Sequence, residues 1–266
     1  MNVSVLLGRQ SYSDDPGVRK LVGIMENEGD TVEFVTKDGG LDSGTDLLLS
    51  VGGDGTFLSA AAMASEKGIP VLGMNLGRLG FLSENTPEDV LRAFPLKRWR
   101  IEDRPLLCAS VENRKFVALN DIVARRSGPS MLGTTVIVDG RKLPTYWADG
   151  LIVSTPSGST AYSLSAGGPI VDPRSEVLLI VPVAPHNLNV RPLIVPSNSR
   201  VEMRFESREP SVQLSHDNNS LLIPVCSSVS VSLSSRVLRR VCLDSSNFIN
   251  ALSEKLFWGE DKRNEK

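Results

Sequence analysis

The chain has 266 residues, of which 41% are hydrophobic and 23% charged, values typical of a globular protein with about two domains. With 29 basic and 31 acidic residues its net charge is −2, which argues against nucleic acid as the main partner. No apolar run approaches the ~20 residues of a membrane helix, and residues 1–7 lack the basic start of a signal peptide. We therefore expect a cytoplasmic protein without membrane or nucleic-acid partners.

Cysteine and histidine are few. Cys108, Cys226 and Cys242 are odd in number and widely spaced, which indicates structural thiols in a reducing compartment. His186 and His216 have no closely spaced partners, so no zinc site of Cys and His is predicted. A divalent metal could still enter with a phosphorylated substrate, held by carboxylates and water.

The first hundred residues alternate between strand and helix patterns. Strands are predicted at 2–7, 31–36, 46–51 and 69–74, and helices at 18–25, 56–67 and 87–94. Thr86 and Pro87, followed by two acids, form the start signal of the last of these helices. The alternation predicts an α/β domain over residues 1–97, with a parallel sheet covered by helices on both faces.

The pattern changes near Arg98, where helical periodicity almost disappears. Short strands are predicted at 106–111, 115–124, 134–138, 143–147, 151–155, 177–183, 200–207, 212–215, 229–233 and 237–243. Asp139-Gly140 is a hairpin signal. Residues 98–243 are therefore predicted to form an all-β domain.

The last segment, residues 244–266, returns to a helical pattern. Ser246 is a candidate cap and Gly259 a stop signal, with a charged tail beyond it. The predicted apolar stripe consists of Phe248, Ile249, Leu252, Leu256 and Phe257.

The most informative motif is Gly52-Gly53-Asp54-Gly55-Thr56, between an apolar strand and a helix. Glycines let a ligand approach the backbone closely, and a helix N-terminus favours phosphate. The acid in such a loop suits a residue that holds a metal or accepts a proton during phosphoryl transfer. A simple tight turn is the alternative, but the flanking strand and helix favour a functional loop.

Two further stretches are candidate binding segments. Asn75–Phe81 follows the next strand, so Arg78 could pair with a phosphate at the same sheet edge, although a solvated surface arginine is as probable. Asp149–Pro169 joins an apolar strand to a loop rich in glycine and hydroxyl residues, which favours sugar or phosphate binding over a linker. Asn120-Asp121 interrupts an apolar strand, and either faces a cleft or marks a bulge or turn.

A hydrolase triad is not supported. His216 and Asp217 are adjacent, so on a strand their side chains would point to opposite faces, and no Gly-x-Ser-x-Gly motif is present. A hairpin turn over residues 215–220 is the preferred interpretation.

Taken together, these motifs closely resemble those of bacterial NAD kinases, also called ATP- or polyphosphate-NAD kinases. The resemblance covers most of the chain, and its Asp149–Pro169 part is more specific than the glycine motif, which lipid kinases and, more loosely, phosphofructokinases share. The other matching segments are Asn75–Phe81, Ala118–Asp121, Pro185-His186, Arg191–Leu193 and Asp217.

The resemblance implies a fold and a reaction. It implies a Rossmann-like N-terminal domain, a β-sandwich C-terminal domain and a final helix that returns to the first domain. The family transfers the γ-phosphate of ATP to the 2′-hydroxyl of the adenosine ribose of NAD, with a divalent metal, Mg²⁺ being the expected ion and polyphosphate a possible donor. It also implies a homodimer or homotetramer.

The resemblance further assigns roles. Asp54 is expected to be the proton acceptor and Asp149 to lie near a nucleobase. Dinucleotide contacts are expected from Gly55, Asn120 and Asp121, and the site lining from Thr160, Ala161, Tyr162, Ser163 and Ser165. Where the family more often has Asn-Glu, this chain has Asn120-Asp121, and the late hairpin has Asn219 where a longer amide is usual.

Two other functions share these features. A lipid kinase would have the same glycine motif but needs an apolar substrate surface, whereas 149–165 is polar. A non-catalytic sensor of NADP(H) would need no Asp54. An assay for NADP formation from ATP and NAD separates all three.

Overall fold

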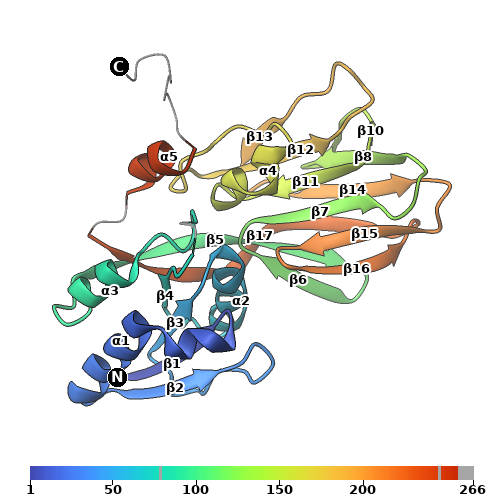
Figure 1. The fold of residues 1–266 in the computed structure, drawn as a ribbon. Helices are drawn as coiled ribbons and strands as arrows, with labels where there is room; N and C mark the ends of the chain where they lie inside the picture. The colour runs from blue at the N-terminus through green and yellow to red at the C-terminus, as the bar shows by residue number, and fades with distance from the viewer. Residues whose placement is uncertain (78–79, 245–246, 257–266) are drawn as a thin grey trace, which may run out of the picture. The chain divides into compact units, whose positions relative to one another are not determined.

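The computed structural model describes residues 1–77, 80–244 and 247–256 and divides into two compact units. The first unit comprises residues 1–103 and the described residues from Leu238 onward, and the second comprises Arg104–Val237. Two long strands, β5 (Trp99–Val111) and β17 (Ser228–Leu243), contribute residues to both units (Figure 1). The fold combines a parallel α/β unit with an antiparallel β unit, as predicted.

A parallel sheet forms the centre of the first unit. Its order is β2 (Thr31–Val35), β1 (Asn2–Leu7), β3 (Leu47–Val51), β4 (Val71–Met74) and the end of β17, where Arg240 pairs with Val71. β3 is buried along its whole length because helices cover both faces of the sheet. The chain thus returns to its first unit before the last helix.

Side chains of β4 show the two covered faces. Leu72 and Met74 pack into a cluster with Leu21 of α1 (Pro16–Asn27) and Val90 of α3 (Pro87–Ala93). Gly73 points the other way, where a Cβ atom would lie 3.0 Å from the ring of Phe57 in α2 (Asp54–Ser65). The predicted Thr86 cap is confirmed as a capping box with Asp89 at the start of α3.

The second unit is a sandwich of antiparallel strands around one apolar core. One sheet has the order β13 (Leu193–Pro196), β12 (Val177–Val183), β11 (Gly150–Ser154), β7 (Asp121–Arg126), β15 (Ser211–His216) and β16 (Asn219–Pro224). The strands opposite are β10 (Tyr146–Ala148), β8 (Leu132–Val138), β14 (Val201–Glu206) and β17, with β5 paired to β6 (Arg114–Ala118) and β9 (Arg141–Lys142) paired to β8. Buried side chains of β7, β11, β8 and β14 share the core.

Several predicted strands required correction. The strand predicted at 115–124 is split into β6 and β7, because the polar pair Asn120-Asp121 ends one strand and begins the next. The two predicted strands 229–233 and 237–243 are the single strand β17. β13 and β16 were not predicted, since such short segments carry little periodicity. Both hairpins, at Asp139-Gly140 and at Asp217-Asn218, are confirmed.

The final helix α5 (Phe248–Leu256) belongs to the first unit. Ala251 is buried, but Ile249 is 60% exposed, so its predicted place in the packed stripe was wrong. Ser246, Phe257 and Gly259 lie outside the described residues. Two short turns, η2 (Ser157–Thr160) and α4 (Tyr162–Ser165), complete the second unit, and 3₁₀-helix η1 (Gln10–Asp14) the first. None of the described helices is long and apolar enough to cross a membrane.

Candidate active site

Asp54 begins α2 directly after the glycine pair that follows β3. Gly52 has a φ of +148°, and a Cβ atom there would lie 2.5 Å from Oγ1 of Thr56. Glycine is therefore required for the chain to turn from strand into helix at this point. This junction is the one that the sequence predicted, and it leaves the Asp54 side chain half-buried at the carboxyl edge of the parallel sheet.

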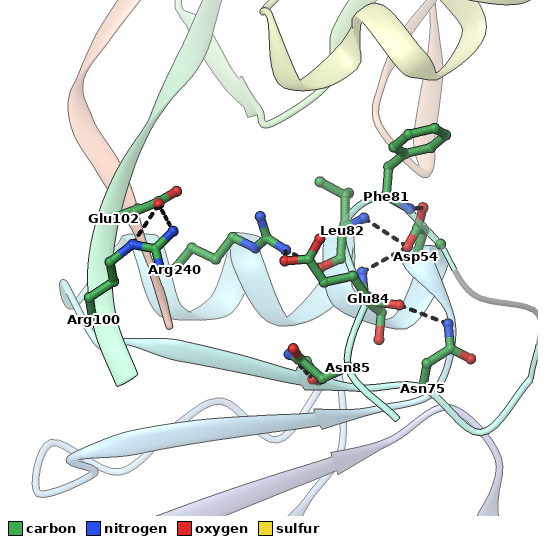
Figure 2. Close-up of polar contacts among 12 residues, drawn as sticks. Asp54, Asn75, Phe81, Leu82, Glu84, Asn85, Arg100, Glu102 and Arg240 are labelled. Carbon is green, nitrogen blue, oxygen red and sulfur yellow. Dashed lines mark hydrogen bonds and ion pairs between the residues drawn. The ribbon is translucent and has the colours of Figure 1, made fainter. Parts of the chain in front are cut away.

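The carboxylate of Asp54 is held by a loop that precedes α3 (Figure 2). Its Oδ1 accepts hydrogen bonds from the backbone N–H groups of Leu82 (3.1 Å) and Ser83 (2.9 Å), and its Oδ2 accepts one from Phe81 (3.0 Å). An ionised carboxylate offers about four acceptor positions. Among the described residues, Oδ2 accepts a single bond, so this oxygen can accept one more.

The loop over residues 80–85 is itself built on buried polar contacts. Nδ2 of Asn75 donates to the Ser83 carbonyl at 2.8 Å, and Oγ of Ser83 donates to the Gly52 carbonyl at 2.9 Å. Arg240 of β17 bonds Glu84 at 2.6 Å and the Leu82 carbonyl at 3.2 Å, and its side chain is 8% exposed (Figure 2). These contacts fix the backbone whose N–H groups hold Asp54. Arg78, a predicted phosphate ligand of this stretch, lies outside the described residues.

In the second unit, Asp217 organises the junction between β6 and β7. Its carboxylate accepts hydrogen bonds from the backbone N–H groups of Leu119 (2.7 Å), Asn120 (2.8 Å) and Asp121 (3.4 Å). Thr155 closes the same junction, because its hydroxyl donates to the Leu119 carbonyl at 2.6 Å. The sequence placed Asp217 in a hairpin turn and suggested a functional role for it only through the resemblance. Its contact with Asn120 joins residues 97 positions apart, which no local pattern could predict.

Two side chains of this region present buried polar atoms without a partner. Oδ1 of Asn120 and Oγ of Ser163 are both buried, and neither has a hydrogen-bond partner among the described residues. Buried polar atoms are nearly always paired in proteins, so these two atoms are candidates for contact with a ligand. The carboxyl group of Asp121 lies at the start of β7 beside the Asp217 carboxylate and is also buried.

The segment 157–168 lies on the outer face of the six-stranded sheet. Tyr162 packs against a cluster that includes Val123 and Ile152, and the guanidinium of Arg125 lies 5.8 Å from the centre of its ring. At Gly158 a Cβ atom would lie 2.2 Å from the Asn120 carbonyl, so glycine permits this close approach. The segment therefore extends from Asn120 toward the β11 end where Gly150 pairs with Arg125.

The remaining predicted residues differ in exposure. Asp149 forms an ion pair with Arg126 at 2.7 Å, with about a third of each side chain exposed. Thr160 and Ala161 are half-buried beside Tyr162, whereas Gly55, Ser165 and Asn219 are exposed. Asn219 is the first residue of β16 and pairs with His216 across the hairpin. The structure thus brings Asn120 and Asp121 together, buries Ser163 in the segment that lies on the same sheet, and leaves Ser165 and Asn219 at the surface.

The charge of the half-buried Asp217 carboxylate acts on the buried carboxyl group of Asp121. Burial, and secondarily the charge of Asp217, raise the pKa of Asp121 from 3.8 to about 7. Burial also raises the pKa of Asp217, while the three backbone N–H groups that it accepts lower it. Asp121 is therefore partly protonated at neutral pH in the ligand-free protein.

Asp121→Asn is expected to stabilise the protein increasingly as pH rises. Because the pKa of Asp121 is higher in the folded than in the unfolded protein, its carboxyl group ionises more readily in the unfolded protein. The free energy of unfolding of the wild type therefore falls between pH ~4 and pH ~7, by at most about 1.4 kcal/mol per pH unit. Asparagine has no carboxyl group to ionise, so the variant lacks this loss of stability. Urea unfolding at pH 5 and pH 8 should show a larger difference between variant and wild type at pH 8. Asp38→Asn, at an exposed acid, is the control, and a pH-independent difference would contradict the expectation.

A metal site built from protein ligands is not present among the described residues. No three His, Cys, Asp or Glu side chains gather there as a possible metal-binding set. Asp54, the predicted candidate, already accepts three backbone N–H bonds. These residues do not form a cation cage.

Models of protein families match both units of the chain. The ATP-NAD kinase N-terminal domain matches residues 20–95, and the ATP-NAD kinase C-terminal domain matches residues 119–242. The NAD kinase of Flavobacterium psychrophilum is 41% identical over 84% of this chain and 80% of its own length. The chain belongs to the NAD kinase family. The NAD kinase of Caldicellulosiruptor bescii is 35% identical over 96% of this chain and 99% of its own.

Solved structures agree with this assignment. The crystal structure of yeast NADH kinase complexed with NADH superposes with a TM-score of 0.85 at 26% identity, covering 100% of this chain and 90% of that one. An NAD kinase from Archaeoglobus fulgidus in complex with ATP gives a TM-score of 0.79 at 25% identity, covering 97% and 99%. The NAD kinase fold predicted from the motifs is therefore confirmed.

Proposed function

We propose that this chain acts as an NAD kinase, which transfers the γ-phosphate of ATP to the 2′-hydroxyl of the adenosine ribose of NAD and forms NADP. Membership of the NAD kinase family supports the reaction. The observation that carries the catalytic assignment is the Asp54 carboxylate, held by three backbone N–H groups with one acceptor position left on Oδ2.

In this proposal Asp54 is the general base. A secondary ribose hydroxyl is a weak nucleophile at neutral pH, and a positioned base contributes about 10²–10⁴-fold. Oδ2 of Asp54 accepts the proton as the ribose oxygen forms its bond to the γ-phosphorus. The bond from that phosphorus to the β,γ-bridging oxygen breaks, and ADP leaves with the electron pair.

The second unit supplies dinucleotide contacts in this proposal. The carboxyl group of Asp121 and the unpartnered Oδ1 of Asn120 are suited to ribose hydroxyl groups, which can donate to both. Ser163 offers a buried hydroxyl, and the ring of Tyr162 a flat surface for a base or ribose. Asp149 is proposed to contact a nucleobase. Further contacts with the substrates are proposed for Gly55, Arg78, Thr160, Ala161, Ser165 and Asn219.

The phosphoryl donor and its cation complete the proposal. ATP is the expected donor, with polyphosphate as an alternative. A divalent cation, Mg²⁺ being expected, would arrive with the triphosphate and be held mainly by phosphate oxygens and water, as is usual for this ion.

We also propose that the chain forms a homodimer or homotetramer. Both outer strands of the six-stranded sheet expose apolar side chains, namely Leu193 (36%) and Ile194 (47%) on β13 and Leu222 (63%) on β16. Such edges favour burial against another copy. Light scattering at micromolar concentration should give a multiple of 28.8 kDa, and a fully active monomer would contradict the proposal.

The function is tested by incubating the purified chain with ATP, MgCl₂ and NAD and measuring NADP with an NADP-specific dehydrogenase. We expect NADP to accumulate, and chelation of the cation with EDTA to stop its formation. Parallel reactions with NADH and with polyphosphate identify the preferred substrates. If NADP does not form from any combination while NADP(H) binds tightly, the chain is a sensor rather than a kinase.

A further inference from the structure

Gly80 and Phe81 share the peptide group that contacts Asp54 on one side and the last helix on the other. The N–H of this peptide belongs to Phe81 and donates to Oδ2 of Asp54 at 3.0 Å. Its carbonyl belongs to Gly80 and accepts a hydrogen bond from the ammonium group of Lys255 in α5. Because a peptide group is planar, the orientation of its carbonyl determines the orientation of its N–H.

Aromatic contacts support the same peptide. The Lys255 ammonium lies 4.8 Å from the centre of the Phe81 ring, which is within the range of a cation–π interaction. The Phe81 ring also contacts Phe248, the first residue of α5, with 6.4 Å between ring centres and 52° between planes. The helix therefore holds this peptide through a hydrogen bond to the Gly80 carbonyl and through two contacts with the Phe81 ring.

We propose that Lys255 is a positioning residue for phosphoryl transfer, which acts by fixing the Gly80–Phe81 peptide so that its N–H holds the Asp54 carboxylate. This inference rests on the proposed role of Asp54 as general base. The positive charge on the carbonyl side polarises the peptide, which strengthens the hydrogen bond on its N–H side. Without it the peptide can rotate, and Oδ2, the oxygen proposed to accept the proton, loses its fixed direction.

Because residue 80 is a glycine, the Gly80–Phe81 peptide depends on contacts from other residues to hold it. A Cβ atom at Gly80 would overlap Asp54, so no side chain at this position can restrain the peptide. Leu82 and Ser83 are fixed by Arg240, Asn75 and Gly52, as described above, but those contacts begin at Leu82. The N–H of Gly80 donates to the Ser83 carbonyl at 3.3 Å, which holds the preceding peptide, and α5 adds the contact to the carbonyl of the Gly80–Phe81 peptide itself. Lys255 lies beyond both matched family models, so neither model includes it.

The experiment measures kcat and KM for Lys255→Met, Lys255→Arg and the control Lys20→Met, which replaces an exposed lysine of α1 in the same unit. We expect Lys255→Met to lower kcat about 10- to 100-fold with KM for NAD nearly unchanged, because the interaction acts on the base rather than on substrate binding. Lys255→Arg, which keeps the charge and the donor, should recover most of kcat. Lys20→Met should match wild type.

A double variant separates positioning from a general loss of structure. If Lys255 acts through Asp54, Lys255→Met should add little to the defect of Asp54→Asn, whereas independent effects would multiply. Amide hydrogen exchange should show the Phe81 amide exchanging faster in Lys255→Met while the global unfolding midpoint is kept. Unchanged kcat in Lys255→Met, or multiplicative loss in the double variant, overturns the proposal. Failure of wild type to form NADP overturns the proposed function instead.

Discussion

An Asp54→Asn variant is expected to lose at least ~10²-fold in kcat while NAD affinity is largely kept. The amide cannot accept the ribose proton, and the base contribution that disappears is about 10²–10⁴-fold. An interaction made mainly in the transition state lowers kcat rather than raising KM. Steady-state kinetics with varied NAD, together with calorimetric NAD binding, measure both quantities.

The hydrogen bonds that Asp54 accepts give a second reason for this variant to lose kcat. An asparagine oxygen can still accept from Leu82 and Ser83, but its NH₂ group then faces the Phe81 N–H, and two donors repel each other. We therefore expect the loss of kcat to lie at the upper end of the range of about 10²–10⁴-fold that a general base contributes, or beyond it. Asp15→Asn is the matched control, because the Asp15 carboxylate of the first unit likewise accepts backbone N–H bonds, as the N-cap of α1, and asparagine caps equally well. An Asp54→Asn enzyme with more than a tenth of wild-type kcat would show that the carboxylate has only a structural role.

Gly80→Ala is expected to reduce kcat by a similar factor, ~10² or more, although it leaves the carboxylate group of Asp54 in place. The added Cβ atom would lie 1.8 Å from Oδ1 and 2.3 Å from Cγ of Asp54, so the loop and the carboxylate cannot keep their present positions. Displacing a catalytic group by about 1 Å can cost on the order of 10²-fold. Because the neighbouring contacts of Asn75, Ser83 and Arg240 remain, the fold itself should survive.

Gly23→Ala provides the matched control for this substitution. Gly23 lies inside α1, and a Cβ atom there meets nothing within 4 Å. Alanine in a helix interior is favoured over glycine by roughly 0.5–1 kcal/mol, so this variant should be as active as wild type and slightly more stable. Thermal unfolding and kcat are measured for both variants. Wild-type activity in Gly80→Ala would mean that the loop adapts without moving Asp54, and the geometric argument would be wrong.

Local sequence alone determined the elements whose signals lie within a few residues. The junction at Gly52–Thr56 was predictable because a buried strand, a glycine turn and a helix start follow one another directly. The Thr86 cap and the two hairpins were predictable for the same reason. These signals also placed Asp54 at a sheet edge and carried the resemblance to NAD kinases, and family matches confirmed that assignment.

Tertiary structure alone decided which groups hold the candidate base and the buried acids. The Lys255 to Gly80 contact spans 175 residues and the Asp217 to Asn120 contact spans 97, so neither produces a periodic or local pattern. The raised pKa of Asp121 likewise depends on burial and on a carboxylate from a distant hairpin. Burial and long-range hydrogen bonds arise only when separate segments pack together, and for that reason the sequence pointed to Asp54 as the candidate base but not to the residues that position it.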